Sequence, residues 1–145
     1  MGHSPVAVQS ADFDGDGFSD LAAVSQTDHS VSVLRGAGDG AFLPQTVYPV
    51  DSAGLAVVGG DFNGDACADL VVGSYDQFSL LTGRGDGTFE VQPPFDPGGA
   101  RYAAAAADFN RDGHLDLVLG GGGELSVHLC NGDGTFQSPS AFYTV

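Results

Sequence analysis

The sequence predicts an all-β fold made of three copies of one unit of about 47 residues. Two motifs that recur on a single period carry this prediction. An acidic motif of ten residues begins at Asp12, Asp61 and Asp108. A glycine-rich motif of seven residues begins at Gly36, Gly83 and Cys130. Because both motifs recur with nearly the same spacing, the repeat extends over the whole chain.

Each repeat has room for four short antiparallel strands, which is the content of one β-propeller blade. In the first copy we expect strands near 6–11, 20–25, 30–36 and 42–49. The segments after the acidic motif are apolar without alternation, which predicts strands buried on both faces: 21–24, 70–73 and 117–120. Segments 31–34 and 125–129 alternate more, which predicts half-exposed strands.

One local signal opposes the repeat. Residues 103–107 are five alanines, and alanine has the highest helix propensity. The equivalent segments 7–11 and 56–60 are poor helix formers, so the repeat register predicts a strand here as well.

The expected organisation is a short added start at 1–4 followed by repeats at 5–50, 51–98 and 99–145. The first residues have neither the basic start nor the apolar stretch of a signal peptide. Propellers close with about four to eight blades, so three blades leave two open edges. We therefore expect a homodimer that completes a six-bladed propeller. A fragment excised from a longer propeller and an engineered repeat protein are the alternatives.

Within the acidic motif, positions 1, 3, 5 and 9 carry side-chain oxygen in every copy. Alternate spacing lets short carboxylates converge on one point while the chain turns. Calcium takes six to eight hard oxygen ligands, and the backbone carbonyl at position 7 would add one. The candidate ligands are Asp12, Asp14, Asp16, Phe18 and Asp20 in the first loop, Asp61, Asn63, Asp65, Cys67 and Asp69 in the second, and Asp108, Asn110, Asp112, His114 and Asp116 in the third.

We expect about one Ca²⁺ per repeat, up to three per chain. No His or Cys side chain occupies a ligand position, which disfavours zinc, and Mg²⁺ is second choice because it demands octahedral geometry. An EF-hand would need a ligand at position 12, where the chain has Ala23, Val72 and Leu119. Asp-rich loops can also be simple turns. Gly17 and Gly113 suit the sharp turn at position 6, whereas Ala66 predicts a strained or weaker second site.

Composition narrows the function. Nineteen acidic against four basic residues give a net charge of −15, which disfavours nucleic acid and anionic membranes as partners. No apolar run approaches the roughly 20 residues of a membrane span, so no membrane insertion is expected. Cys67 and Cys130 fall at non-equivalent points of the repeat and are expected to be free thiols.

The two motifs, Asp-Phe-Asn-Gly-Asp-Gly-x-x-Asp-Leu and Gly-x-Gly-Asp-Gly-x-Phe, resemble the FG-GAP (VCBS-type) repeat, which is related to the calcium-binding blades of integrin α-subunits. The resemblance covers the chain from about residue 5. It implies four-stranded propeller blades with Ca²⁺ in a hairpin loop, held at the positions named above. It also favours an extracellular or cell-surface location. Ala66, the two Asn residues at position 3 and Cys130 depart from the pattern.

The family's roles imply a non-catalytic module that binds a glycan or protein, or an adhesion scaffold. The alternatives are a fragment that only assembles and binds metal, and an appendage of a secreted enzyme. No nucleophile motif is present, so we expect no enzyme. Aromatic and Arg residues between the motifs could bind sugars or peptides, although packing between blades is the favoured interpretation: Tyr48, Tyr75, Gln77, Phe78, Phe95, Arg101 and Tyr102.

Overall fold

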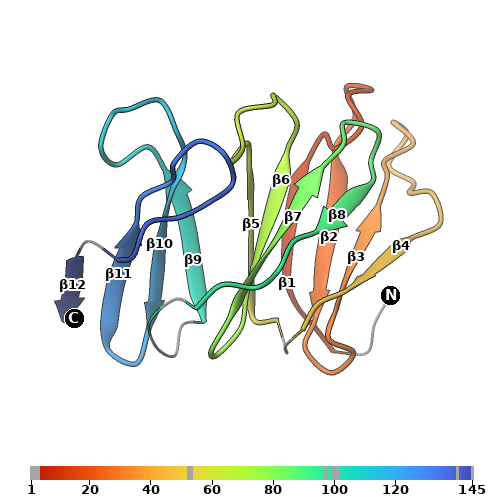
Figure 1. Cartoon of the computed structure of the whole chain (residues 1–145). Helices are drawn as coiled ribbons and strands as arrows, with labels where there is room; N and C mark the ends of the chain where they lie inside the picture. The colour runs from red at the N-terminus through yellow and green to blue at the C-terminus, as the bar shows by residue number, and fades with distance from the viewer. Residues whose placement is uncertain (1–3, 52–53, 97, 99–101, 140, 145) are drawn as a thin grey trace.

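The chain forms three four-stranded antiparallel sheets arranged side by side like propeller blades (Figure 1). The structure is a computed structural model that describes residues 4–51, 54–96, 98, 102–139 and 141–144. Within that part of the chain there is no helix, and therefore none that could cross a membrane. The predicted all-β fold with four strands per repeat is confirmed.

Each sheet takes its strands in sequence order, so no strand is exchanged between blades. Blade 1 contains β1 (Pro5–Ala11), β2 (Asp20–Ser25), β3 (Ser30–Leu34) and β4 (Thr46–Pro49). Blade 2 contains β5 (Ala56–Gly60), β6 (Asp69–Gly73), β7 (Phe78–Gly83) and β8 (Phe89–Val91). Blade 3 contains β9 (Ala103–Ala107), β10 (Asp116–Gly121), β11 (Glu124–His128) and β12 (Ala141–Thr144).

The second strand of each blade is its most enclosed element. Every residue of β6 is buried, and β2 is buried except at Leu21. These strands have a neighbouring strand on each side and a neighbouring blade over at least one face, which explains their unbroken apolar sequence. The expectation of a half-exposed strand at 31–34 is wrong, because Ser32 is 1% exposed. It lies inside the sheet between Ala23 and Val47.

The alanine run folds as strand β9, as the repeat register predicted. Ala103 to Ala107 pair in antiparallel register with Gly120 to Asp116 of β10. Ladder hydrogen bonds and packing against β5 therefore override the helix propensity of alanine.

The hydrophobic core lies between the blades. The inner strands β1, β5 and β9 run side by side through the middle of the molecule (Figure 1). One buried cluster joins blades 1 and 2, and a second joins blades 2 and 3. Each junction therefore depends on residues of two repeats, and this places chemical groups from different repeats next to each other.

Cys67 and Cys130 are both free, as predicted. Burial is the main cause that raises the pKa of the Cys130 thiol, which donates to the Phe62 carbonyl of the neighbouring blade at 3.2 Å. This cysteine therefore replaces a glycine of the repeat with a contact across the junction.

Candidate functional site

The three acidic loops share one hydrogen-bond framework. The position-1 carboxylate turns back over its loop and accepts the backbone N–H groups of positions 4 and 6. Asp12 accepts from Gly15 at 2.8 Å and from Gly17 at 2.9 Å. Asp61 and Asp108 make the equivalent bonds. These bonds hold the loop backbone in its turn, so the position-1 aspartate shapes the loop as well as offering ligand oxygen.

The position-9 aspartate is a structural anchor that the sequence analysis missed. Asp20, Asp69 and Asp116 are fully buried. Asp20 accepts the N–H of Phe13 at 2.8 Å with one oxygen and the N–H of Gly36 at 2.7 Å with the other. Both bonds recur in the other repeats. They replace the water lost on burial and tie the acidic motif to the glycine-rich motif. The common period of the two motifs was the signal that could have revealed this link.

Burial dominates the electrostatics of the second anchor. It raises the pKa of Asp69, against the two backbone donors, Gly83 and Phe62, which act to lower it.

Position 6 has the left-handed backbone that the sequence predicted. The φ angles are +88° at Gly17, +91° at Gly113 and +67° at Ala66. A left-handed conformation costs a residue with a Cβ atom roughly 1–2 kcal/mol. The second loop is therefore strained at Ala66.

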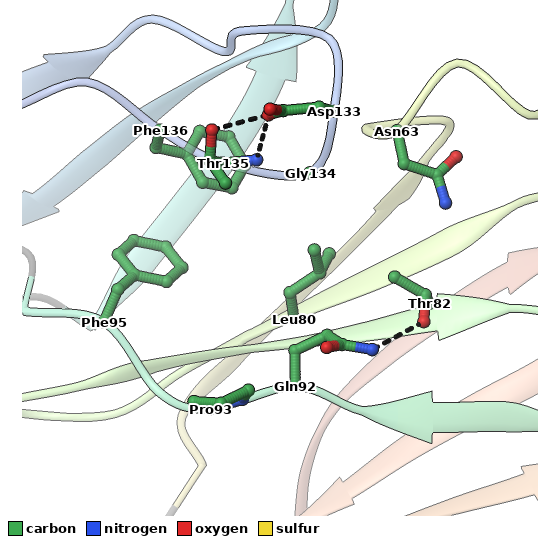
Figure 2. A pocket seen from close by; sticks show the side chains of 10 residues that line it. All are labelled: Asn63, Leu80, Thr82, Gln92, Pro93, Phe95, Asp133, Gly134, Thr135 and Phe136. Atoms are coloured by element: carbon green, nitrogen blue, oxygen red, sulfur yellow. Dashed lines mark hydrogen bonds between the residues drawn. The ribbon is translucent and has the colours of Figure 1, made fainter.

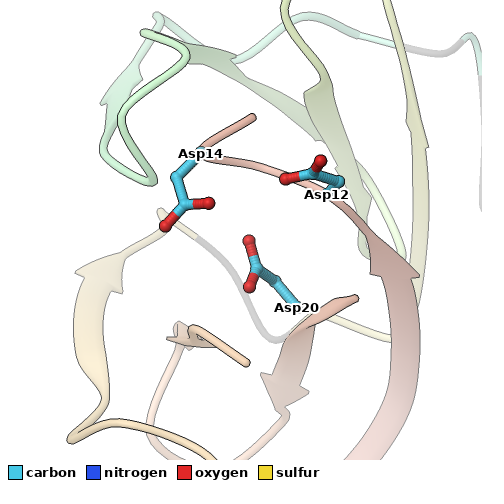
Figure 3. A group of neighbouring side chains, drawn as sticks. All are labelled: Asp12, Asp14 and Asp20. Atoms are coloured by element: carbon cyan, nitrogen blue, oxygen red, sulfur yellow. The ribbon is translucent and has the colours of Figure 1, made fainter. Parts of the chain in front are cut away.

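The first loop brings three carboxylates together (Figure 3). Asp12, Asp14 and Asp20 each offer an oxygen, and these oxygens lie within 4.8 Å of one another. Oxygens around one Ca²⁺ lie about 2.3–2.6 Å from it, so opposite ligands are roughly 5 Å apart. The residues present therefore fit a calcium ion. Asp16 is outside this group, and its Oδ1 accepts the Phe18 N–H at 2.8 Å.

The second and third loops are arranged differently at position 3. Asn63 donates from its amide to Asp65 at 2.9 Å, and Asn110 donates to Asp112 at 2.7 Å. Backbone N–H bonds from position 7, followed by these amide bonds, lower the pKa of Asp65 and Asp112. In the described part of the chain, the first loop holds the one group of three acidic, His or Cys side chains that is close enough for a metal.

The residues at position 7 have side chains that cover the glycine-rich motif. A Cβ at Gly38 would lie 2.6 Å from the Phe18 ring, and one at Gly132 would lie 2.4 Å from the His114 ring. At Gly85 the same atom would lie 3.0 Å from the Cys67 sulfur. Close approach of these side chains therefore requires glycine at the third position of the motif. The backbone N–H of each position-7 residue bonds to the position-5 carboxylate.

A pocket of about 460 Å³ opens at the junction of blades 2 and 3 (Figure 2). Its lining comes from both repeats: Asn63, Leu80, Thr82, Gln92, Pro93, Phe95, Asp133, Gly134, Thr135 and Phe136. The Phe95 and Phe136 rings stack with centroids 5.2 Å apart. Sequence reasoning named Phe95 as a possible ligand contact and Asn63 as a metal ligand. It missed the other lining residues because the pocket forms only where two blades meet.

Polar groups surround the aromatic pair. Gln92 donates to the Thr82 hydroxyl at 3.0 Å, and Asp133 Oδ1 accepts the Thr135 N–H at 3.0 Å (Figure 2). The Thr135 hydroxyl also donates to Asp133 Oδ1, and this bond, followed by the amide bond, lowers the pKa of Asp133. Asp133 is therefore charged at neutral pH.

The remaining aromatic residues named from the sequence make ring contacts. Tyr48 contacts Phe89 of the next blade, and Phe78 contacts Phe95 within the second repeat, with ring centroids 5.8 and 5.9 Å apart. Tyr75 and Tyr102 pair across blades 2 and 3 at 6.4 Å and are both about half exposed. Arg101 lies outside the described residues.

Solved structures resemble this arrangement. An Agrocybe aegerita lectin, described as recognising non-reducing terminal N-acetylglucosamine, is 28% identical with a TM-score of 0.69, over 91% of this chain and 37% of that chain. The Photorhabdus luminescens Tc holotoxin pore is 25% identical with a TM-score of 0.56, over 95% of this chain and 7% of that chain. BBS1N, solved with ARL6DN, has the same fold at 14% identity with a TM-score of 0.65, over 96% and 43%. The chain thus spans less than half of each.

The sequence comparisons agree with the repeat. A search of curated proteins finds no match. The family model for the FG-GAP-like repeat matches twice, at residues 12–72 and 61–119, and these matches together cover both internal blade junctions. The chain therefore belongs to the family of FG-GAP-like repeats.

Proposed function

We propose that this chain is a non-catalytic glycan-binding module whose site is the pocket between blades 2 and 3. The observation that carries the proposal is the combination of stacked aromatic rings with converging polar groups in one pocket. A volume of about 460 Å³ lies within the roughly 300–1,000 Å³ of small-molecule sites, and it holds one or two sugar rings.

The lining has the two kinds of surface that a sugar needs. A pyranose ring presents C–H groups on its face and hydroxyls at its edge. The C–H face packs on the negative face of an aromatic ring, here that of Phe95 or Phe136. Hydroxyls bond to polar groups at the rim, where Asp133 accepts and Gln92 both donates and accepts. Charged acceptors form the stronger bonds, so Asp133 is the expected main contact.

The likeness to the lectin supports this assignment. At 28% identity it suggests the class of ligand, a terminal sugar, and N-acetylglucosamine is the first probe to use.

A titration with N-acetylglucosamine and its short oligomers, followed by calorimetry, tests the proposal. The matched variants are Asp133→Ala and Asp86→Ala. Both aspartates accept the same two bonds from a threonine two residues later, so the two substitutions should destabilise their turns to the same extent. Asp86 does not line the pocket. We expect saturable binding that Asp133→Ala weakens at least tenfold while Asp86→Ala leaves it unchanged. Equal effects of the two variants, or no binding across a glycan array, would contradict the proposal.

We also propose that the acidic loops bind Ca²⁺ and that the first loop binds it most tightly. Three gathered carboxylates support this order, because in the other loops the Asn amide already satisfies the position-5 carboxylate. The neighbouring Arg35 guanidinium, 3.6 Å from Asp14, competes with a cation for that carboxylate. Binding to the folded state raises stability by mass action.

Thermal melting in millimolar calcium and in excess chelator tests the metal. We expect a higher Tm in calcium. Asp14→Asn makes the first loop like the other two and should remove most of the shift, whereas Asn110→Asp should increase it. Identical melting in calcium and chelator would refute calcium binding and would leave the glycan proposal to its own test.

A further inference from the structure

We propose that the two free ends of the blade row are complementary faces and that two copies of this chain join through them, head to tail, into a closed ring of six blades. The proposal goes beyond glycan and calcium binding and depends on neither. It rests on a junction that the described residues build twice, and on the two halves of the same junction that are exposed on blades 1 and 3.

Each blade has two different faces. The leading face, which meets the next blade, consists of Ala22, Val31 and Val33 in blade 1 and of Val71, Phe78 and Leu80 in blade 2. The trailing face, which meets the preceding blade, consists of Leu70, Val72 and Leu81 in blade 2 and of Leu117 and Leu119 in blade 3. A leading face packs on a trailing face at both internal junctions, and all of these residues are at most 4% exposed.

A hydrogen bond and a ring contact fix the same geometry at both junctions. At the first junction, Gly87 donates its N–H to the Phe13 carbonyl at 3.1 Å, and the rings of Phe13 and Phe89 meet edge to face at 5.3 Å. At the second junction, Gly134 donates to the Phe62 carbonyl at 3.0 Å, and Phe62 meets Phe136 at 5.8 Å. The junction is therefore a specific, repeated interface.

Blade 3 also has a leading face, and none of the residues that the structure describes forms a trailing face against it. By the repeat register its members are Val118, Leu125 and Val127, all of them partly exposed. Phe109 is the equivalent of Phe13 and Phe62, which are 2% and 1% exposed, yet Phe109 is 50% exposed. This face is as apolar as the two internal ones, and no other blade covers it within the described part of the chain.

Blade 1 begins with a trailing face in the same condition. An apolar groove of about 360 Å³ runs over it, lined by Val8, Leu21, Ala23 and Leu34 among others. Val8 is 64% exposed, and Phe42, the equivalent of the 6% exposed Phe89, is 43% exposed. Gly40 corresponds to Gly87 and Gly134, and a Cβ there would meet no atom within 4 Å.

The expected partner is a second copy of this chain. The exposed trailing face of blade 1 in one copy can pack on the exposed leading face of blade 3 in the other. Gly40 of one copy would donate to the Phe109 carbonyl of the other, and their Phe42 and Phe109 rings would meet. Head-to-tail contacts close into rings when the rotation allows. Propellers close with about four to eight blades, and six is the one multiple of three in that range. Two copies therefore close the ring with two identical junctions.

Charge works against this association. Each copy carries −15, so two copies repel at low ionic strength. Salt screens that repulsion, with a Debye length of about 8 Å at 0.15 M. The apolar contacts of the junction are less sensitive to salt than this repulsion is. Association should therefore strengthen as the salt concentration rises.

Light scattering after size exclusion of the full chain, at 0.15 M salt and over a range of concentrations, tests the proposal. The expected mass is twice 14.7 kDa. A mass of 14.7 kDa at every concentration overturns the proposal, and so does a mass that grows without limit, which indicates open filaments.

Two variants distinguish head-to-tail pairing from pairing of one face with itself. Val8→Asp alters the trailing end and Phe109→Ser alters the leading end, and each residue is at least half exposed, so the single chain should still fold. Because every junction contains one of each, either variant alone should return the mass to one chain. The control Val91→Asp, on the internal blade 2, should remain a dimer. A dimer that survives either end variant overturns the head-to-tail ring, and circular dichroism confirms that each variant is folded.

Discussion

The junction of blades 1 and 2 and the junction of blades 2 and 3 have the same backbone plan and different contents. Both place a buried Phe of the acidic loop against a Phe of the next glycine-rich motif. At the first junction Arg35 occupies the place that Thr82 has at the second. The Arg35 side chain lies so close to Gly87 that a Cβ there would be 2.6 Å from its Cδ. A long side chain fills the first junction, and a short one leaves the pocket at the second.

A second position changes together with the first. Arg35 is paired with Asp14 at 3.6 Å, whereas the pocket has neutral Asn63 in the equivalent place. Tyr48 likewise replaces Phe95, and its hydroxyl accepts the Phe89 N–H at 3.2 Å. The repeat thus fixes the scaffold, while a few positions decide whether a junction is filled or open to a ligand.

The largest effect should come from removing the shared ring. Phe13→Ala and Phe62→Ala should each lower the free energy of unfolding by about 3–5 kcal/mol, as for other buried aromatics. Phe13→Ala should cost more, because its junction holds Arg35 and Tyr48 in the places where the second junction has the pocket. Urea denaturation measures the difference. Phe109→Ala in the monomeric form is the control and should cost about 1 kcal/mol or less, since that ring is half exposed. Equal costs at all three positions would contradict the idea that Phe13 and Phe62 stabilise the chain by packing at blade junctions.

Exchanging the contents of the junctions should move the binding site. Thr82→Arg with Asn63→Asp gives the second junction the residues of the first, and sugar affinity should fall at least tenfold as Arg fills the pocket. Arg35→Thr with Asp14→Asn should open a second pocket and raise the number of sugars bound per chain. Calorimetry, which gives the affinity and the number of sugars bound per chain, tests both exchanges. Unchanged binding after Thr82→Arg would place the sugar site elsewhere.

Sequence reasoning reached the repeat, the four-stranded blades and the left-handed turn because these follow from periodicity and local backbone chemistry. It assigned Asp20, Asp69 and Asp116 a single role as ligands, because their burial and their bonds to distant amides appear only after folding. The pocket was beyond its reach for the same reason. Thr82 and Thr135 are 53 residues apart in the chain and adjoin only across a blade junction.

The second loop, which belongs to the open junction, also carries a removable strain. Ala66→Gly relieves about 1–2 kcal/mol of left-handed strain but adds freedom to the unfolded chain, so a net gain of about 0.5–1 kcal/mol is expected. In a chain of this size this raises Tm by about 2–4 °C. Gly113→Ala is the reciprocal control and should lower Tm by a similar amount, since no atom obstructs a Cβ there. A fall in Tm for Ala66→Gly would mean that other parts of the structure compensate for the left-handed strain at Ala66.

The smallest effect separates what the two junctions share from what they do not. Asp86 and Asp133 both have a lowered pKa, first because of a threonine hydroxyl and then a threonine N–H. A carboxyl group with a lowered pKa in the folded state adds stability above its unfolded pKa of about 3.9, and this stability is lost as the pH falls through the folded pKa.

Thr88→Val and Thr135→Val should raise the pKa values of Asp86 and Asp133 toward normal, as measured by carboxyl carbon shifts in NMR titrations. Without sugar the two shifts should match, because the turns are the same. With sugar bound, the pKa of Asp133 alone should fall further, since a hydroxyl donating to the charged form favours ionisation. A ligand that leaves the titration of Asp133 unchanged does not contact this carboxylate, and the pocket would then hold the sugar through its rings and amides.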